Sequence, residues 1–356
     1  MSLLFNARRA KCVKIIFPLV KHISTNNNQR SIALLNSKRS CLTSARTIWP
    51  NHKNAGKSII LGFSLLGLVG LEESDTNRQL IDTIKRGILY FKNGDYNAFE
   101  QTLHEALKIA NDLQNVDGIT HVYDVLANGA FMNKEYEKAK DLFTKVVCRL
   151  IDQGCLKDDL IILHLGLQIS KIYEIQKEYK YSEYGYLYCL QHLEKKLKID
   201  PENKAILDLY AKTLNAYGRY LMSQKEIKLA KISFKRAYAI NVKLNGETFE
   251  NNVIFLNLLG TLYHAGGNFH KAVLYFRKAK KIGQHLHDMK SFAVVYINLA
   301  DTYFKLGMLE KAEKSCEKAL QNAKIHSNFR AKKEAEIGLA RVNNAMKKRR
   351  IGNVRK

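Results

Sequence analysis

Residues 296–319 read YINLADTYFKLGMLEKAEKSCEKA, and this stretch decides how the chain folds. It predicts two helices separated by a turn at residues 305–307, Lys-Leu-Gly. Small side chains allow two helices to cross closely, and an aromatic side chain beside them fills the remaining space. The residues that share the facing sides at helical spacing are Leu299, Ala300, Tyr303, Ala312, Cys316 and Ala319.

The same pattern occurs five more times upstream. Its crossing positions hold Gly, Ala, Ser or Cys in every unit, except for Phe99 and Val146. This pattern resembles the tetratricopeptide repeat, whose single unit cannot bury its own apolar face and therefore stacks on neighbours. We predict an all-α, right-handed superhelical solenoid of about six repeats at residues 80–346, with a C-terminal capping helix. The repeats start near residues 80, 120, 163, 211, 253 and 293.

The spacing between these starts is longer than the ~34 residues of the standard repeat. Proline stops helices, and the whole chain contains only Pro18, Pro50 and Pro201. We therefore favour second helices that run on for an extra turn or two, for example over residues 271–287. Longer loops are the alternative explanation.

The chain begins with a basic segment. Residues 1–71 contain no Asp or Glu but eleven Lys or Arg, with apolar side chains among them. Such a composition is typical of a mitochondrial transit peptide, which we assign to residues 1–57. A disordered basic tail that binds nucleic acid is the alternative.

An apolar segment follows at residues 58–72, and residues 59–71 carry no charge. As a helix these would span ~20 Å, which is short of the ~30 Å hydrocarbon core. We expect membrane association as an interfacial or docking helix, with capping of the first repeat as the alternative. At the other end, residues 347–356 form a basic tail.

No catalytic or cofactor motif emerges from the sequence. H-E-x-x-H, G-x-S-x-G and dinucleotide-binding glycine patterns are all absent, so we expect neither an enzyme nor a bound cofactor or metal. Cys189 and Cys316 occupy repeat packing positions, which predicts small buried thiols.

Residues 120–143, THVYDVLANGAFMNKEYEKAKDLF, carry a more specific signal. The string Tyr-Asp, Ala-Asn and Ala-Phe within it, the apolar run 63–68 and Arg-Tyr-Leu at 219–221 resemble the family of tetratricopeptide repeat protein 19. This is a mitochondrial family linked to respiratory complex III. The resemblance spans roughly residues 59–340, while the transit region is similar in character only.

The resemblance implies a matrix-facing protein of the mitochondrial inner membrane that binds complex III. It also implies a role in clearing fragments of the Rieske iron–sulfur subunit, which supports the integrity of the complex. The family has no known catalytic residues, so none are carried over to this chain.

The repeat register also predicts which side chains face the concave groove. Asparagine recurs there, and a side-chain amide can hold a peptide backbone because it both donates and accepts hydrogen bonds. Ordinary solvated helix faces are the alternative. The expected partner-binding residues are Asp124, Asn128, Phe131, Lys171, Lys212, Asn215, Arg219, Asn257, His264, Asn298 and Asp301.

Two other functions remain open from the sequence. One is a general mitochondrial adaptor or chaperone cofactor. The other is a mitochondrial RNA-binding helical repeat protein, which the basic charge outside the transit region allows. Because the units carry packing residues and irregular spacing rather than base-selecting pairs, nucleic acid is not the partner we expect.

The basic segment generates a first prediction. Residues 1–57 fused to a fluorescent protein should direct it to mitochondria, because they combine many bases with no acid. Fluorescence microscopy against a mitochondrial marker is the measurement. Diffuse cytosolic or nuclear fluorescence would contradict the targeting assignment.

Overall fold

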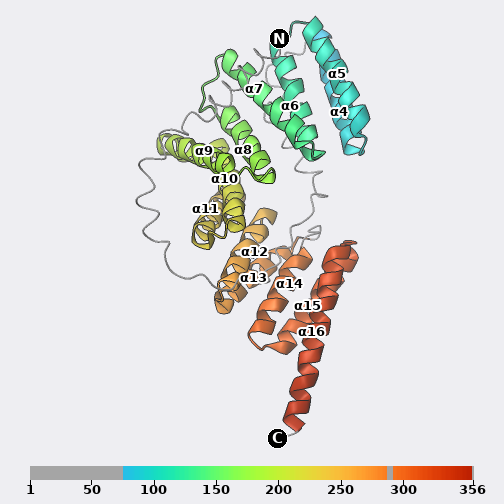
Figure 1. Cartoon of the computed structure of the whole chain (residues 1–356), viewed down its shortest axis with the longest axis vertical. Helices are drawn as coiled ribbons and strands as arrows, with labels where there is room; N and C mark the ends of the chain where they lie inside the picture. The colour runs from blue at the N-terminus through green and yellow to red at the C-terminus, as the bar shows by residue number, and fades with distance from the viewer. Residues whose placement is uncertain (1–74, 287–291, 355–356) are drawn as a thin grey trace. The chain divides into compact units, whose positions relative to one another are not determined.

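The structure is a computed structural model that describes residues 75–286 and 292–354. Those residues form thirteen helices and no strand, which confirms the all-α prediction. The chain divides into two compact units near residue 200 (Figure 1). The first unit contains α4 (Asp75–Lys92), α5 (Tyr96–Asp112), α6 (Val116–Met132), α7 (Tyr136–Asp152), α8 (Leu160–Ile175) and α9 (Tyr179–Ile199). The second contains α10 (Lys204–Ser223), α11 (Ile227–Asn245), α12 (Glu250–Ala265), α13 (Phe269–Gly283), α14 (Phe292–Lys305), α15 (Leu309–Ile325) and α16 (Phe329–Val354).

Helices α4 to α15 are six antiparallel pairs, so the predicted number of repeats is confirmed. In the first unit α4 packs on α5, α6 on α7 and α8 on α9, and each second helix also packs on the first helix of the next pair. The second unit repeats this arrangement from α10 to α15, and α16 packs on both α14 and α15. Helix α16 is therefore the predicted capping helix.

The same three-residue turn ends most of these helices. Its central residue has a positive φ, as at Gly94, Gly267 and Gly307. The amide that follows donates back to a carbonyl five residues earlier, for instance from Asn268 N to Tyr263 O at 2.9 Å and from Met308 N to Tyr303 O at 2.9 Å. This is the Schellman type of helix ending, which satisfies carbonyl groups that the helix leaves unpaired.

Close contacts between a small residue and a ring set the spacing of the helix pairs. A Cβ added at Gly260 would lie 2.5 Å from Cε1 of Phe276, so the ring packs directly on the backbone of α12. Phe99, one of the two exceptions in the sequence pattern, is accommodated in the same way. Its ring fills the space at Gly129 of the next repeat, where an added Cβ would lie 2.2 Å away.

The long repeat spacing comes in part from long second helices, as the sequence favoured, since α9 and α11 have 21 and 19 residues. Longer connections, the alternative, also contribute, because residues 153–159 separate α7 from α8 and residues 284–291 separate α13 from α14. The expected long helix over residues 271–287 is wrong, however, because α13 ends at Gly283. Gly283 packs against the ring of Phe292, which starts α14, with an added Cβ only 2.3 Å from Cε2. A helix that continued past this point would lose that contact.

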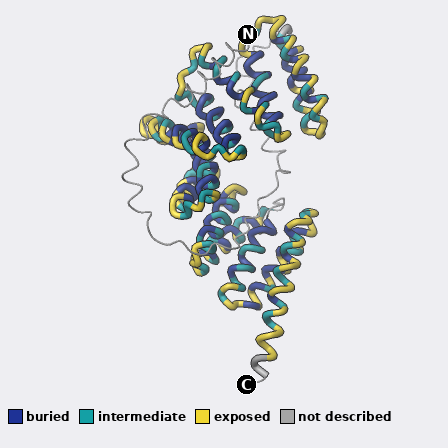
Figure 2. The backbone as a smooth tube through the Cα atoms, viewed as in Figure 1, coloured by how far each residue is buried: buried dark blue, intermediate teal, exposed yellow. Residues whose placement is uncertain are grey.

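Burial follows the repeat pattern (Figure 2). Cys189 and Cys316 are buried free thiols, as predicted. Helix α16 includes the first residues of the basic tail and is exposed over its last described turns. The transit segment 1–57 and the apolar segment 58–72 lie outside the described residues. Within the described part of the chain, no helix is both long and apolar enough to cross a membrane.

Ala300 provides a test of the packing. It is 2 % exposed and lies in a cluster with Leu309, Ala312, Cys316 and Val342. Ala300→Asp would bury an unpaired charge there and should lower the free energy of unfolding by about 3 kcal/mol or more, measured by urea denaturation.

The exposed Ala239 on α11 gives a matched control for this substitution. Ala239→Asp introduces the same side chain at the surface and should change the free energy of unfolding by less than about 1 kcal/mol. Equal stabilities of the two variants would show that the packing register is wrong.

Candidate functional site

The predicted binding residues lie on the first helices of the repeats, in both units. In the first unit, α6 carries Asp124, Asn128 and Phe131, and α8 carries Lys171. Asp124 and Asn128 are buried, with 4 % and 8 % of their surface exposed. Phe131 is partly buried and packs edge-on against Tyr136, with ring centroids 5.9 Å apart.

Asp124 and Asn128 form a local pair. Asn128 Nδ2 donates to the backbone oxygen of Asp124 at 2.8 Å and to Asp124 Oδ1 at 3.2 Å. Burial raises the pKa of Asp124 to about 7, while the hydrogen bond from Asn128 acts in the opposite direction. Burial also lowers the pKa of His121, which lies three residues before Asp124 on the same helix. Helix α6 therefore holds a buried carboxyl group whose charge changes near neutral pH.

Lys171 forms a hydrogen bond with a residue of its own helix. Its Nζ donates to Gln168 Oε1 at 3.1 Å, and its side chain is half-buried. The first unit thus brings Asp124 and Asn128 into contact, while Phe131 and Lys171 contact other neighbours. The role of these four residues in partner binding stays a prediction.

The second unit contains a pair of hydrogen-bonded asparagines on adjacent first helices. Asn298 Nδ2 of α14 donates to Asn257 Oδ1 of α12 at 3.0 Å, across one repeat. Both side chains are half-buried. Among the described residues, the remaining amide nitrogen and the remaining amide oxygen of this pair have no partner. The pair therefore presents one donor group and one acceptor beside each other, which matches the needs of a peptide group.

A charged cluster lies at the end of the same strip. His264 Nε2 is 3.1 Å from Asp301 Oδ2, and Arg341 of α16 forms an ion pair with Asp301. The Arg341 guanidinium also lies over the Phe304 ring, 4.5 Å from its centroid. Burial acts to raise the pKa of Asp301, but His264 and Arg341 outweigh it and hold the pKa at about 2. Asp301 is therefore ionised, and the Arg341 guanidinium balances its charge.

Thr302 connects the charged cluster at Asp301 to the Asn257–Asn298 pair. His264 Nδ1 lies 2.9 Å from Thr302 Oγ1, and this hydroxyl donates to the backbone oxygen of Asn298 at 2.7 Å. Because the single hydroxyl proton goes to Asn298, the ring nitrogen of His264 is the donor to Thr302. His264, Asp301 and Thr302 thus fix the position of Asn298.

The remaining predicted residues lie on α10. Lys212 forms an ion pair with Asp208 of the same helix at 2.6 Å. Arg219 Nε donates to Asn215 Oδ1 at 3.3 Å. We therefore use the strip formed by Asn257, His264, Asn298 and Asp301 as the candidate site and call it the α12–α14 strip.

Two residues of the site, Arg341 and Thr302, were not predicted from the sequence. Arg341 lies on the capping helix, 40 residues from Asp301, and no repeat register connects the two. Thr302 is fully buried and follows Asp301 directly, so its spacing of four from Asn298 is a signal that could have found it. In the described part of the chain no cluster of His, Cys, Asp or Glu could hold a metal ion.

Comparison with known proteins agrees with this geometry. The family described as "Tetratricopeptide repeat" matches residues 254–282 and 293–324. The crystal structure of BtubC from P. vanneervenii is similar with a TM-score of 0.52 and 20 % identity, over 72 % of this chain and 94 % of that one. That of aspartyl phosphate phosphatase F from Bacillus subtilis has a TM-score of 0.54 and 13 % identity, over 79 % and 83 %. At such identities the likeness shows the fold alone, which is a tetratricopeptide repeat solenoid, a fold typical of non-enzymatic protein-interaction scaffolds.

Relatives in sequence define the family more closely. The chain is 33 % identical to the mitochondrial tetratricopeptide repeat protein 19 homolog of Drosophila melanogaster, over 78 % of this chain and 76 % of that protein. It is 26 % identical to mitochondrial tetratricopeptide repeat protein 19 of Homo sapiens, over 72 % and 69 %. The chain belongs to the tetratricopeptide repeat protein 19 family. Its relatives' names indicate a mitochondrial protein, and its repeats indicate a role in protein interaction.

The buried Asp124 predicts a dependence of stability on pH. Its pKa is raised from 3.8 to about 7 on folding, so its stabilising contribution is complete below pH 3.8 and is lost as the pH rises through about 7. Asp124→Asn keeps the oxygen that accepts from Asn128 but cannot ionise. The variant should gain on the order of 4 kcal/mol in unfolding free energy relative to the unchanged chain between about pH 4 and pH 8.

Urea denaturation of both proteins at the two pH values is the measurement. Asp117→Asn on the exposed first turn of the same helix is the control and should leave the pH dependence unchanged. A stability difference between Asp124→Asn and the unchanged chain that is constant with pH would show that Asp124 does not titrate in this range.

Proposed function

We propose that the chain binds an extended segment of a partner protein along the α12–α14 strip. The observation that supports this is the Asn257–Asn298 pair, which leaves one amide donor group and one amide acceptor beside each other without a partner in the described part of the chain. A peptide group needs one of each, so the pair holds a backbone without selecting a side chain. First helices of stacked repeats are the usual binding surface of such solenoids.

The partner is proposed from the family resemblance. It is respiratory complex III, and the bound segment is the Rieske iron–sulfur subunit or a fragment of it. The chain then acts as a non-enzymatic protein on the matrix side of the mitochondrial inner membrane, where it promotes removal of Rieske fragments and supports the integrity of the complex. The charged cluster at Asp301 adds no net binding charge, because the Arg341 guanidinium already neutralises this carboxylate.

Replacing both asparagines tests the strip. Asn257→Ala with Asn298→Ala removes both members of the pair, so neither amide is left without its partner. Two amide contacts at ~0.5–1.5 kcal/mol each predict a ~5–150-fold weaker binding of Rieske peptides. Fluorescence anisotropy with peptides that tile the N-terminal region of the Rieske subunit measures this, and circular dichroism checks the fold.

The matched control replaces Asn251 and Asn344, which are exposed. Asn251→Ala with Asn344→Ala should leave peptide binding and co-purification of complex III from detergent-solubilised mitochondria unchanged. In mitochondria that lack the chain, Rieske fragments should accumulate, and only the control variant should clear them. Equal clearance by both variants would place partner binding outside the α12–α14 strip.

A further inference from the structure

Helices α11 and α13, the second helices of two consecutive repeats, carry no acidic residue. Each has five Lys or Arg and neither has Asp or Glu. The next second helix, α15, differs because Glu310, Glu313 and Glu317 alternate with its lysines. Helices α11 and α13 therefore each carry five positive charges with no acidic residue of their own to balance them.

Three lysines from these helices surround one tyrosine. The Nζ atoms of Lys231, Lys235 and Lys271 lie 4.3, 6.0 and 5.9 Å from the centroid of the Tyr263 ring. The same ring also stacks on Tyr275, with ring centroids 5.2 Å apart and an interplanar angle of 9°. Within the described residues, none of the three ammonium groups forms an ion pair with a carboxylate.

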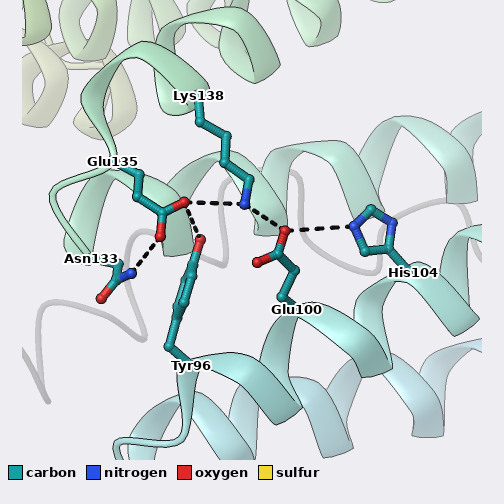
Figure 3. A network of polar contacts seen from close by, with 6 residues as sticks. All are labelled: Tyr96, Glu100, His104, Asn133, Glu135 and Lys138. Carbon is teal, nitrogen blue, oxygen red and sulfur yellow. Dashed lines mark hydrogen bonds and ion pairs between the residues drawn. The ribbon is translucent and has the colours of Figure 1, made fainter.

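The first unit shows what usually balances such a lysine. Lys140 of α7 lies over Tyr173 at 5.4 Å, at the same repeat positions as Lys231 and Tyr263, and it pairs with Glu137 at 2.9 Å. The position equivalent to Glu137 on α11 is Lys228. Lys138 of α7 likewise lies between Glu100 at 2.5 Å and Glu135 at 3.1 Å (Figure 3). The carboxylate that neutralises Lys140 in the first unit is thus replaced by a positive charge, Lys228, on α11.

The lysines therefore stand in one another's field. Burial lowers the pKa of Lys231, the charges of Lys235 and Lys271 lower it further, and only Tyr263 opposes them. The pKa of Lys235 is instead raised, because its side chain forms a hydrogen bond with Tyr263. An external anion near the three ammonium groups would remove this repulsion.

Aliphatic side chains on the same helices are exposed. Leu229, Ile232 and Leu274 have 48 %, 54 % and 58 % of their surface exposed. Ile232 lies four residues after Lys228 and three before Lys235, and Leu274 lies three after Lys271 and four before Lys278, so apolar and basic side chains share the outer faces. We call the residues Lys228, Leu229, Lys231, Ile232, Lys235, Lys271, Leu274 and Lys278 the basic face.

We propose that the basic face docks on a bilayer that contains anionic phospholipids. Lysines there attract the headgroup phosphates, and the aliphatic side chains between them enter the boundary with the acyl chains. A nucleic acid fits less well, because stacking of bases needs open aromatic rings and the ring of Tyr263 is already in contact with Lys231 and Tyr275. This surface is separate from the α12–α14 strip, and its role does not depend on the proposed partner.

Vesicle sedimentation with the full chain tests the proposal. The probes are vesicles of phosphatidylcholine alone and of phosphatidylcholine mixed with phosphatidylglycerol, each at low and high salt. The variant Lys231→Gln, Lys235→Gln and Lys271→Gln should bind the anionic vesicles roughly 10- to 100-fold more weakly at low salt. Its binding to the neutral vesicles should equal that of the unchanged chain.

A control of equal charge replaces three lysines on α15. Lys311→Gln, Lys314→Gln and Lys318→Gln remove the same net charge beside the glutamates of that helix and should change binding to anionic vesicles less than about threefold. A single variant, Lys228→Glu, installs the acid that accompanies Lys140 in the first unit and should weaken binding as the triple variant does. All these residues are on helix surfaces, and circular dichroism verifies the fold.

Equal loss in the α11–α13 and α15 variants would overturn the proposal, because it would show a response to net charge alone. Ile232→Ser with Leu274→Ser distinguishes a bilayer from a soluble acidic partner. This variant should lose affinity for anionic vesicles and keep its affinity for soluble poly-glutamate and for single-stranded RNA. If it bound vesicles like the unchanged chain while poly-glutamate or RNA displaced them, the basic face would serve an acidic protein or nucleic acid instead.

Discussion

The turn that ends the helices determines the repeat architecture. Without proline to stop them, these helices end at a residue in the left-handed conformation, and an amide donates to a carbonyl five residues earlier. The turn spans three residues, so the next helix must return along the previous one. Small residues at the crossing then allow the pair to close on an aromatic ring, as Gly260 does on Phe276. This repeated turn, together with the contact between a small residue and an aromatic ring, gives rise to the long helices, the buried core and the α12–α14 strip.

The sequence predicts this fold wherever the turn uses a residue with a distinctive backbone preference or the helix crossing uses a distinctively small residue. Gly307 marks a left-handed turn because it has no Cβ, and Ala312 and Ala319 mark a crossing because they are small. Other turns place Lys134 and Lys225 in the left-handed conformation, and lysine gives no sign of it. The limits of α13 could not be predicted either, since its end depends on the contact of Gly283 with Phe292 after the turn.

The candidate site was predictable to the extent that the repeat register determines it. The register correctly places Asn257 and Asn298 at equivalent positions of adjacent first helices, so their hydrogen bond follows from the repeat. It says nothing of Arg341, because the capping helix lies outside the repeat pattern. It also does not distinguish Asp124, which is buried, from Asp301, which is partly exposed and contacts both Arg341 and His264. The pKa values of these two carboxyl groups consequently shift in opposite directions, although both occupy first helices.

Two surfaces of the second unit thus use their charges differently. On the α12–α14 strip the charged groups are neutralised within the protein, which leaves the asparagine amides as the groups available to a partner. On the basic face, no carboxylate within residues 75–286 and 292–354 forms an ion pair with the lysines, which stand among exposed aliphatic side chains. The first kind of surface suits recognition of a backbone at close range, where desolvation of unpaired charge would be costly. The second suits a planar, anionic and partly apolar partner, to which positive charge and aliphatic surface both contribute. Helix α12 carries both Asn257 of the strip and Tyr263, whose ring contacts lysines of the basic face, so a single helix fixes the spacing between the two surfaces.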